Sequence, residues 1–276
     1  MRSSPAQLLR RAYRDARTVR ALRPRLSFIA SGYDTTFTSL ERQVYRKLAQ
    51  LEATYRDLEW RLIVVDDLPV HFELEAAAHR AGERFGSPNR VAILPYGGAR
   101  FEDGREKGAA LLQAMRYACA AEAPDALCYL NLNLKVHAAF SATGMRRVLG
   151  DGHAAAIGTR SPEEGGWPRG AGSLGRTKSR IFNALVASLL PEIGRYRDTN
   201  APLKVFSPEA ARLLSDRARV RHITMDCEWL VLLHQEGLHP VRFPIVWTQA
   251  RGSQPPWHRV PASAFDILRL RINASN

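Results

Sequence analysis

The stretch CYLNLNLKVHAAF, residues 128–140, carries the pattern that decides the fold. A short apolar run ends there in two asparagines, Asn131 and Asn133, and Lys135 follows two positions later. Short apolar runs between longer helical patterns are typical of buried strands in a parallel sheet. Because such sheets bind ligands beyond the carboxyl ends of their strands, we expect residues 131–135 to belong to a binding site.

Four further apolar runs repeat this pattern. With residues 126–130, the predicted strands cover 26–31, 61–66, 90–95 and 154–158. Helical patterns fall around residues 38–54, 71–85, 105–121 and 138–148. This alternation predicts a single α/β domain with a mainly parallel sheet flanked by helices. The first strand is followed by SGYDTT, which lacks the glycines of a dinucleotide-binding turn and counts against a dehydrogenase.

Composition indicates a globular protein with a sizeable core, since 45% of its 276 residues are hydrophobic and 24% are charged. No apolar run approaches the ~18 residues that span a bilayer, and the N-terminus has no continuous apolar stretch of a signal peptide. We therefore expect a cytoplasmic protein. The three cysteines, Cys119, Cys128 and Cys227, have no metal-site spacing and are interpreted as reduced, mostly buried thiols.

The net charge of +13 is concentrated at the N-terminus, where residues 1–25 hold eight arginines and one acid, Asp15. Apolar residues recur there at helical spacing: Leu8 or Leu9, Ala12, Ala16 and Val19. The segment predicts a basic amphipathic helix. We favour a solvated helix packed on the domain over an anchor to an anionic membrane, because the stripe is mostly alanine and buries little area. No nucleic-acid-binding module is recognisable.

Several motifs resemble one enzyme family. They are IVVDD (63–67), GREKGAALLQAMRYA (104–118), AIGTRS (156–161), GRTKSRIFNALVASLL (175–190), RDTNAPLKVFSPEAARLL (197–214), MDCEWLVLLHQEG (225–237) and VRFPIVWTQARGSQ (241–254). In this order and spacing they resemble glycosyltransferase family 2 enzymes of the GT-A fold, nearest to the polyprenyl-phosphate (dolichol-phosphate) mannosyl- and glucosyltransferases. The resemblance divides the chain into a helical extension (1–25), a glycosyltransferase domain (26–253) and a C-terminal tail or helix (254–276).

The resemblance implies transfer of a hexose from a UDP- or GDP-linked sugar to a polyprenyl phosphate or a related phosphate. A soluble small-molecule acceptor is the alternative. Donor-binding residues would be Asp34, Asp66, Asp67, Lys107, Asn131, Asn133, Arg160 and Arg176. Lys178, Lys204 and Trp229 would lie on the acceptor side, and Lys135, Asp198, Asp226 and Glu228 would be catalytic. These types suit the chemistry, because carboxylates accept hydrogen bonds from a base or ribose and cations neutralise a departing pyrophosphate.

Asn131-Leu132-Asn133 stands where the family carries Asp-x-Asp to hold Mg²⁺ or Mn²⁺, and Lys135 stands at a third ligand position. Hard cations prefer anionic oxygen ligands, so we expect no metal cofactor, with weakly bound Mg²⁺ or Mn²⁺ as the alternative. Three explanations follow, in order of preference. Lys135 and the arginines replace the metal; or catalysis is lost and a nucleotide-sugar or partner-binding module remains; or a metal binds through Asp67, Asp226 or Glu228.

Two segments leave alternatives open. Residues 161–175 contain five glycines and two prolines, which indicates either a lid over the site or a plain surface connector. The C-terminal FDILRLRI (265–272) is basic and apolar, like the N-terminal helix. Together they suggest peripheral contact with an anionic membrane at its inner face.

Overall fold

The structure is a computed structural model that describes residues 3–31, 40–66, 74–85, 88–98, 107–170, 173–221, 224–248, 267–268 and 270–272. Within these ranges, the side chains of residues 40, 41, 74, 77, 88, 173–176, 178 and 179 are outside the description.

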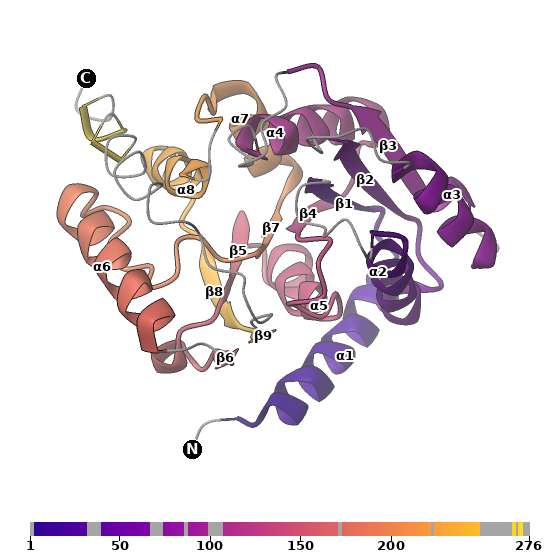
Figure 1. Cartoon of the computed structure of the whole chain (residues 1–276), viewed down its shortest axis with the longest axis horizontal. Helices are drawn as coiled ribbons and strands as arrows, with labels where there is room; N and C mark the ends of the chain where they lie inside the picture. The colour runs from indigo at the N-terminus through magenta and orange to yellow at the C-terminus, as the bar shows by residue number, and fades with distance from the viewer. Residues whose placement is uncertain are drawn as a thin grey trace.

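One seven-stranded sheet forms the centre of the molecule (Figure 1). Its strands are β1 (Leu26–Ser31), β2 (Trp60–Asp66), β3 (Val91–Pro95), β4 (Ala126–Leu130), β5 (Ala155–Thr159), β7 (Leu203–Phe206) and β8 (Val241–Pro244), in the order β3-β2-β1-β4-β7-β5-β8. β7 runs antiparallel to both β4 and β5, and the other neighbours are parallel. A second, two-stranded sheet pairs β6 (Trp167–Arg169) with β9 (Val246–Thr248) in parallel.

Helices cover both faces of the sheet (Figure 1). They are α1 (Pro5–Leu22), α2 (Leu40–Tyr55), α3 (Leu74–Arg84), α4 (Lys107–Tyr117), α5 (Phe140–Met145), α6 (Ser173–Leu189), α7 (Pro208–Arg217) and α8 (Met225–Gln235). A π-helical turn extends α4 over Ala118–Glu122 and another extends α5 over Arg146–Gly150. Short 3-10 turns lie at Pro88–Arg90 and Pro162–Glu164.

β1, β2, β4 and β5 are mostly apolar because both of their faces are largely buried. Along β1, Phe28 and Ala30 pack with α1, α2 and α5, whereas Ile29 packs on the opposite face with α4, α7 and α8. This alternation follows from the two-residue period of a strand. A third cluster joins α6 and α8 to Ile267 and Leu270 of the C-terminal segment.

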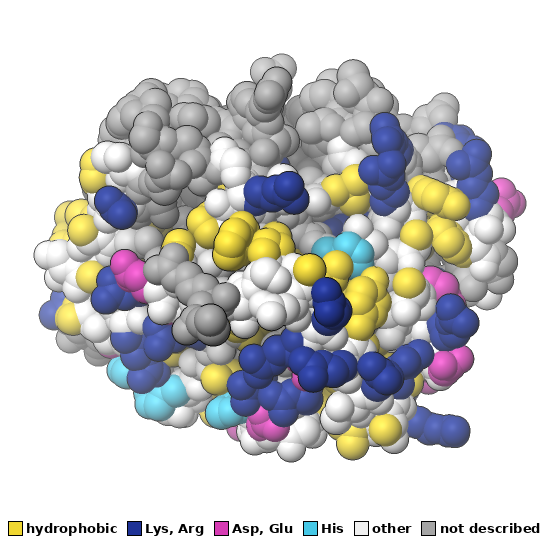
Figure 2. Space-filling view, turned by 90° about the horizontal axis from the view of Figure 1, so that it is seen from below, with side chains coloured by type: hydrophobic (Ala, Val, Ile, Leu, Met, Phe, Trp, Pro, Cys, Tyr) yellow, Lys and Arg dark blue, Asp and Glu magenta, His cyan; other side chains and the backbone are white. Residues whose placement is uncertain are grey.

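The predicted N-terminal helix is present as α1, and its apolar stripe is buried as expected for a helix packed on the domain. Leu8, Ala12, Ala16 and Val19 share the core with α5 and the sheet. Asp15, the one acid in residues 1–25, accepts a hydrogen bond from Thr143 Oγ1 (2.7 Å) and lies 3.2 Å from Arg146 Nε. The arginines point outward, and Figure 2 shows Lys and Arg side chains gathered on the face that includes α1.

The sequence-based prediction of an α/β fold with a mainly parallel sheet is confirmed, and the five predicted strands are present within one residue at each end. The segment 161–175 is not a plain connector over its described part, because Trp167–Arg169 pairs with β9. Its role as a lid stays a prediction, as does the division of the chain at residues 25 and 253. The three cysteines are free, and burial raises the pKa of Cys227 to about 12, so this thiol stays protonated.

Candidate functional site

The predicted site residues gather where β4 and β5 end and β7 begins. The register pairs Lys204 of β7 with Tyr129 of β4 on one side and with Ile157 of β5 on the other. Asn131 follows the end of β4, and Arg160 follows the end of β5. α8 brings Asp226 to the same place, because its carboxylate meets Lys204. Three side-chain pairs organise this region, and each is described below.

The first pair is buried. Lys204 Nζ lies 2.6 Å from Asp226 Oδ1 and also donates to the carbonyl of Ala201 (2.6 Å). The side chains of Lys204 and Asp226 are only 1% and 7% exposed. A buried charge needs a partner of opposite charge, and Lys204 and Asp226 are partners to each other. The pair therefore joins the centre of the sheet to the start of α8.

The second pair is Arg160 with Asp198. Both carboxylate oxygens of Asp198 accept from the guanidinium, at 2.9 Å from Nε and 2.6 Å from Nη2, and Oδ2 also accepts from the backbone N–H of Arg160 (2.7 Å). Burial lowers the pKa of Arg160, but the Asp198 carboxylate outweighs it and raises that pKa, so the side chain stays charged. The guanidinium lies 5.3 Å from the ring centroid of Trp247. This bidentate contact fixes the direction in which Arg160 points.

The third pair is Tyr129 with Asn131. The Tyr129 hydroxyl donates to Asn131 Oδ1 at 2.7 Å. Two ammonium groups lie near the tyrosine ring, Lys107 Nζ at 5.6 Å and Lys204 Nζ at 5.5 Å from its centroid. Lys107 begins α4, so this contact connects the helix start to the end of β4.

Lys135 lies in a turn just past Asn133. Its backbone N–H donates to Asn133 Oδ1 (3.2 Å), and its carbonyl accepts from the N–H of Thr248 at the end of β9 (2.8 Å). An asparagine that bonds a backbone N–H two residues on forms a local turn of this kind. The side chain of Lys135 is half-buried, so its predicted place near a donor phosphate stays a prediction.

Glu228 holds backbone instead of lying open to a ligand. Its two oxygens accept from the N–H groups of Arg219 and Val220, both at 2.8 Å. Burial raises the pKa of Glu228, and these two hydrogen bonds oppose the rise. The segment it fixes supports α4, because the Arg221 carbonyl accepts from the N–H of Gly108 (2.8 Å). A side chain at Gly108 would meet this backbone at 2.7 Å, so the close approach requires glycine.

Asp66 ends β2 at nearly the height of Asn131. The register pairs Ile29 of β1 with both Ile63 and Tyr129, and β1 lies between β2 and β4. Two strand spacings separate Asp66 from the end of β4 by about 10 Å. Asp34 and Asp67 lie outside the described residues, as do the side chains of Arg176 and Lys178.

Two residues predicted on the acceptor side are buried, and that role stays a prediction for both. Lys204 is buried in its ion pair, and Trp229 is 1% exposed and packs edge-on against Tyr129 and Phe206. Neither side chain is exposed, because Lys204 lies at the sheet centre in β7 and Trp229 lies on the core-facing side of α8. Sequence reasoning also missed Tyr129, although its position two residues before Asn131 places both on one side of the strand.

Four described side chains at this edge that could offer oxygen ligands to a divalent cation are already engaged by the protein. Asn131 and Asn133 are neutral and their oxygens accept hydrogen bonds from the protein, Asp226 is paired with Lys204, and Glu228 holds backbone. Among the residues that the structure describes, no three His, Cys, Asp or Glu side chains are grouped to hold a metal ion. These residues do not fit Mg²⁺ or Mn²⁺, which prefer carboxylate oxygens.

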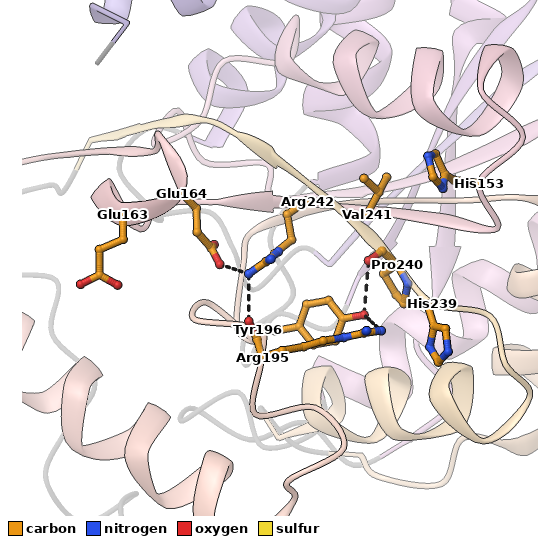
Figure 3. Close-up of a pocket in the computed structure, with 9 residues that line it drawn as sticks. All are labelled: His153, Glu163, Glu164, Arg195, Tyr196, His239, Pro240, Val241 and Arg242. Carbon is orange, nitrogen blue, oxygen red and sulfur yellow. Dashed lines mark hydrogen bonds and ion pairs between the residues drawn. The ribbon is translucent and has the colours of Figure 1, made fainter. Parts of the chain in front are cut away.

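A separate groove of about 610 Å³ lies beside the edge strand β8 (Figure 3). It is lined by His153, Glu163, Glu164, Arg195, Tyr196, His239, Pro240, Val241 and Arg242, none of which is a predicted site residue. Its polar groups largely bind one another: Arg242 pairs with Glu164 and donates to the Arg195 carbonyl (2.9 Å), and Tyr196 donates to the Pro240 carbonyl (3.3 Å). We therefore assign the site to the edge formed by β4, β5 and β7.

The sheet order and the position of this site define a GT-A fold, and comparison with solved structures agrees. Glucosyl-3-phosphoglycerate synthase from Mycobacterium tuberculosis, in complex with Mn²⁺, UDP and glucosyl-3-phosphoglycerate, aligns with a TM-score of 0.62 and 16% identity, over 99% of this chain and 84% of that chain. Its complex with Mn²⁺, UDP and phosphoglyceric acid aligns with a TM-score of 0.63 and 16% identity, over 95% of this chain and 82% of that chain. A mycobacterial protein aligns with a TM-score of 0.62 and 16% identity, over 95% of this chain and 78% of that chain.

At this identity the similarity establishes the GT-A fold alone. No protein-family model and no curated protein matches the sequence. No helix in the described part of the chain is long and apolar enough to cross a membrane.

Proposed function

We propose that the protein is a glycosyltransferase that moves a hexose from a UDP- or GDP-linked sugar to an acceptor carrying a phosphate, without a divalent cation. The observation that supports this most is the group of cationic and amide side chains at one edge of a GT-A sheet. Lys107 and Asn131 both contact Tyr129 there, and Arg160 follows the end of the neighbouring β5. The carboxylates of Asp198 and Asp226 are engaged by Arg160 and Lys204. A departing nucleoside diphosphate needs such positive charge in place of a metal.

The acceptor class rests on two independent likenesses. The sequence motifs resemble polyprenyl-phosphate transferases, and the fold resembles that of glucosyl-3-phosphoglycerate synthase, which is seen with phosphoglyceric acid. Both molecules present a phosphate on a small or flexible group. The placement in family 2 and the lipid acceptor are the finer part of the proposal.

Binding of the donor is the first test. The melting temperature would be measured with a panel of UDP-, GDP-, dTDP- and CDP-sugars, each with EDTA and with Mn²⁺. A ligand at one hundred times its Kd stabilises the fold by about 2.7 kcal/mol, which is a readily measured shift. We expect one UDP- or GDP-sugar to raise the melting temperature in EDTA. No shift with any member of the panel would refute the proposal.

Arg160→Ala tests where the donor binds. We expect it to weaken nucleotide binding by ten- to a hundredfold, since a hydrogen bond to a charged group contributes about 1.5–3 kcal/mol. Arg197→Ala is the matched control, because Arg197 is 64% exposed and pairs only with the exposed Glu163 at 3.0 Å. Equal affinities for the two variants would place the donor elsewhere.

Transfer itself is tested with two acceptors. Release of nucleoside diphosphate would be followed with a polyprenyl phosphate in vesicles and with phosphoglyceric acid in solution, both in EDTA. Turnover with the first supports a lipid acceptor, and turnover with the second a soluble one. Lys135→Ala should lower turnover about a hundredfold, the effect of removing one group that stabilises a transition state. Donor binding without turnover on either acceptor would favour the alternative, a non-catalytic nucleotide-sugar-binding module.

Peripheral contact with an anionic membrane is a further part of the proposal. The apolar stripe of α1 is buried, so α1 would act mainly through its exposed arginines, among them Arg10, Arg14 and Arg17. Such contact is electrostatic and weakens with salt. In flotation with anionic liposomes, the protein should rise at low salt and remain at the bottom at high salt. Protein at the bottom under both conditions argues for a soluble acceptor.

A further inference from the structure

The two asparagines that end β4 are held in defined orientations by the protein. The Tyr129 hydroxyl donates to Asn131 Oδ1 at 2.7 Å, and the backbone N–H of Lys135 donates to Asn133 Oδ1 at 3.2 Å. A backbone N–H can only donate, so the group facing it on Asn133 must be the oxygen. In both side chains the oxygen is turned toward the protein and the amide nitrogen is on the other side.

The amide nitrogens are therefore the groups that this edge presents. In the part of the chain that the structure describes, neither Asn131 Nδ2 nor Asn133 Nδ2 donates to a protein atom. Each carries two N–H donors, which bind anionic oxygens and cannot ligate a cation. Both side chains are only half-buried, so a ligand can reach them.

The charge around them also favours an anion. Lys107 Nζ lies 5.6 Å from the ring of Tyr129, the residue that orients Asn131, and Lys135 follows Asn133 by two residues. Two acids of the region are engaged by other cations, Asp226 by Lys204 at 2.6 Å and Asp198 by Arg160. An anion at this edge would meet amide N–H donors with lysines close by.

We propose that Asn131 and Asn133 hydrogen-bond the pyrophosphate of the donor directly through their amide N–H groups, in the place where a divalent cation would otherwise stand. The inference rests on the proposed function for the identity of the ligand. It explains why two amides occupy this position. A pair of aspartates would repel the phosphate oxygens unless a cation stood between them, whereas amide N–H groups bind those oxygens directly. Tyr129 is a positioning residue in this scheme, since its hydroxyl would act on the ligand through Asn131.

The test measures binding of UDP and of inorganic pyrophosphate by calorimetry, in EDTA and in Mn²⁺. Wild type should bind UDP in EDTA, and Mn²⁺ should change its affinity less than threefold. Asn131→Asp and Asn133→Asp keep the shape but replace donors with a charge, and each should weaken binding in EDTA by ten- to a hundredfold. Asn89→Asp adds the same charge at an exposed position before β3 and should leave affinity unchanged.

Tyr129→Phe supplies an independent variant, because it keeps the strand and removes only the hydroxyl that orients Asn131. It should weaken UDP binding severalfold while the melting temperature of the free protein changes little. Variants that bind as wild type does, or a wild type that needs Mn²⁺ to bind UDP, would overturn the inference and leave the proposed function standing. Binding of pyrophosphate but of no nucleotide or nucleotide sugar would do the reverse, leaving an anion site without the transferase.

Discussion

Replacing Lys204 with methionine should destabilise the protein severely, because it leaves the Asp226 carboxylate buried without its partner. Lys204 is 1% exposed, and its ammonium serves both Asp226 and the Ala201 carbonyl at 2.6 Å. Removing one member of a buried ion pair costs about 3–5 kcal/mol. Since domains are stable by only about 5–15 kcal/mol, this one substitution should remove about a fifth or more of the free energy of unfolding.

Urea unfolding at pH 7, followed by tryptophan fluorescence, measures the loss. The double variant Lys204→Met/Asp226→Leu removes both charges, and it should recover most of the lost stability because an apolar pair of similar volume replaces a buried ion pair at little cost. Arg197→Met, which breaks an ion pair with 64% and 62% exposed side chains, should cost less than about 1 kcal/mol. A Lys204→Met variant within 1 kcal/mol of wild type, or a double variant no more stable than the single one, would refute this reasoning.

Three further variants test other contacts. Burial, assisted by the Lys47 ammonium, lowers the pKa of His137 from 6.5 to about 4. The unfolded chain therefore binds this proton more tightly than the folded protein does, and the free energy of unfolding falls as pH drops from 6.5 toward 4. The loss should reach up to about 3 kcal/mol and be absent from His137→Gln, as measured by thermal unfolding across this range. Asp15→Ala should cost about 1–3 kcal/mol through its lost contacts to α5, against less than about 0.5 for the exposed Arg14→Ala, compared by urea midpoints. Glu228→Ala should cost about 2 kcal/mol and speed hydrogen exchange at the N–H groups of residues 219 and 220; unchanged exchange there would contradict the hydrogen bonds described.

Most of the strands could be predicted from the sequence because they are buried on both faces. A run such as Ala126–Leu130 is then apolar along its length and ends where polar residues begin. The stripe of α1 was equally visible, because Leu8, Ala12, Ala16 and Val19 keep helical spacing and all four are buried. Local periodicity decides both features, so a single segment carries the information.

What could not be predicted depends on contacts between distant segments. The four residues of β7 are too few for a pattern, and nothing in them indicates a place between β4 and β5. The partner of each charge could not be predicted either. Lys204 was predicted on the acceptor side, and only the strand register shows that it lies at the sheet centre beside Asp226. Asp198 was predicted as catalytic from the motif around it, and the contact of its two oxygens with Arg160 could not be read from that motif.

The strand order has a consequence for how the chain is synthesised. Among the described strands, β5 pairs only with β7 and β8, and both leave the ribosome after it. Residues 155–159 therefore wait for residue 203 to emerge, a few seconds at about 5–20 residues per second. During that interval the edge of β4 that will bind β7 is open as well. An apolar strand and an unpaired edge together make an aggregation-prone nascent chain, and this is the interval in which a chaperone would protect it.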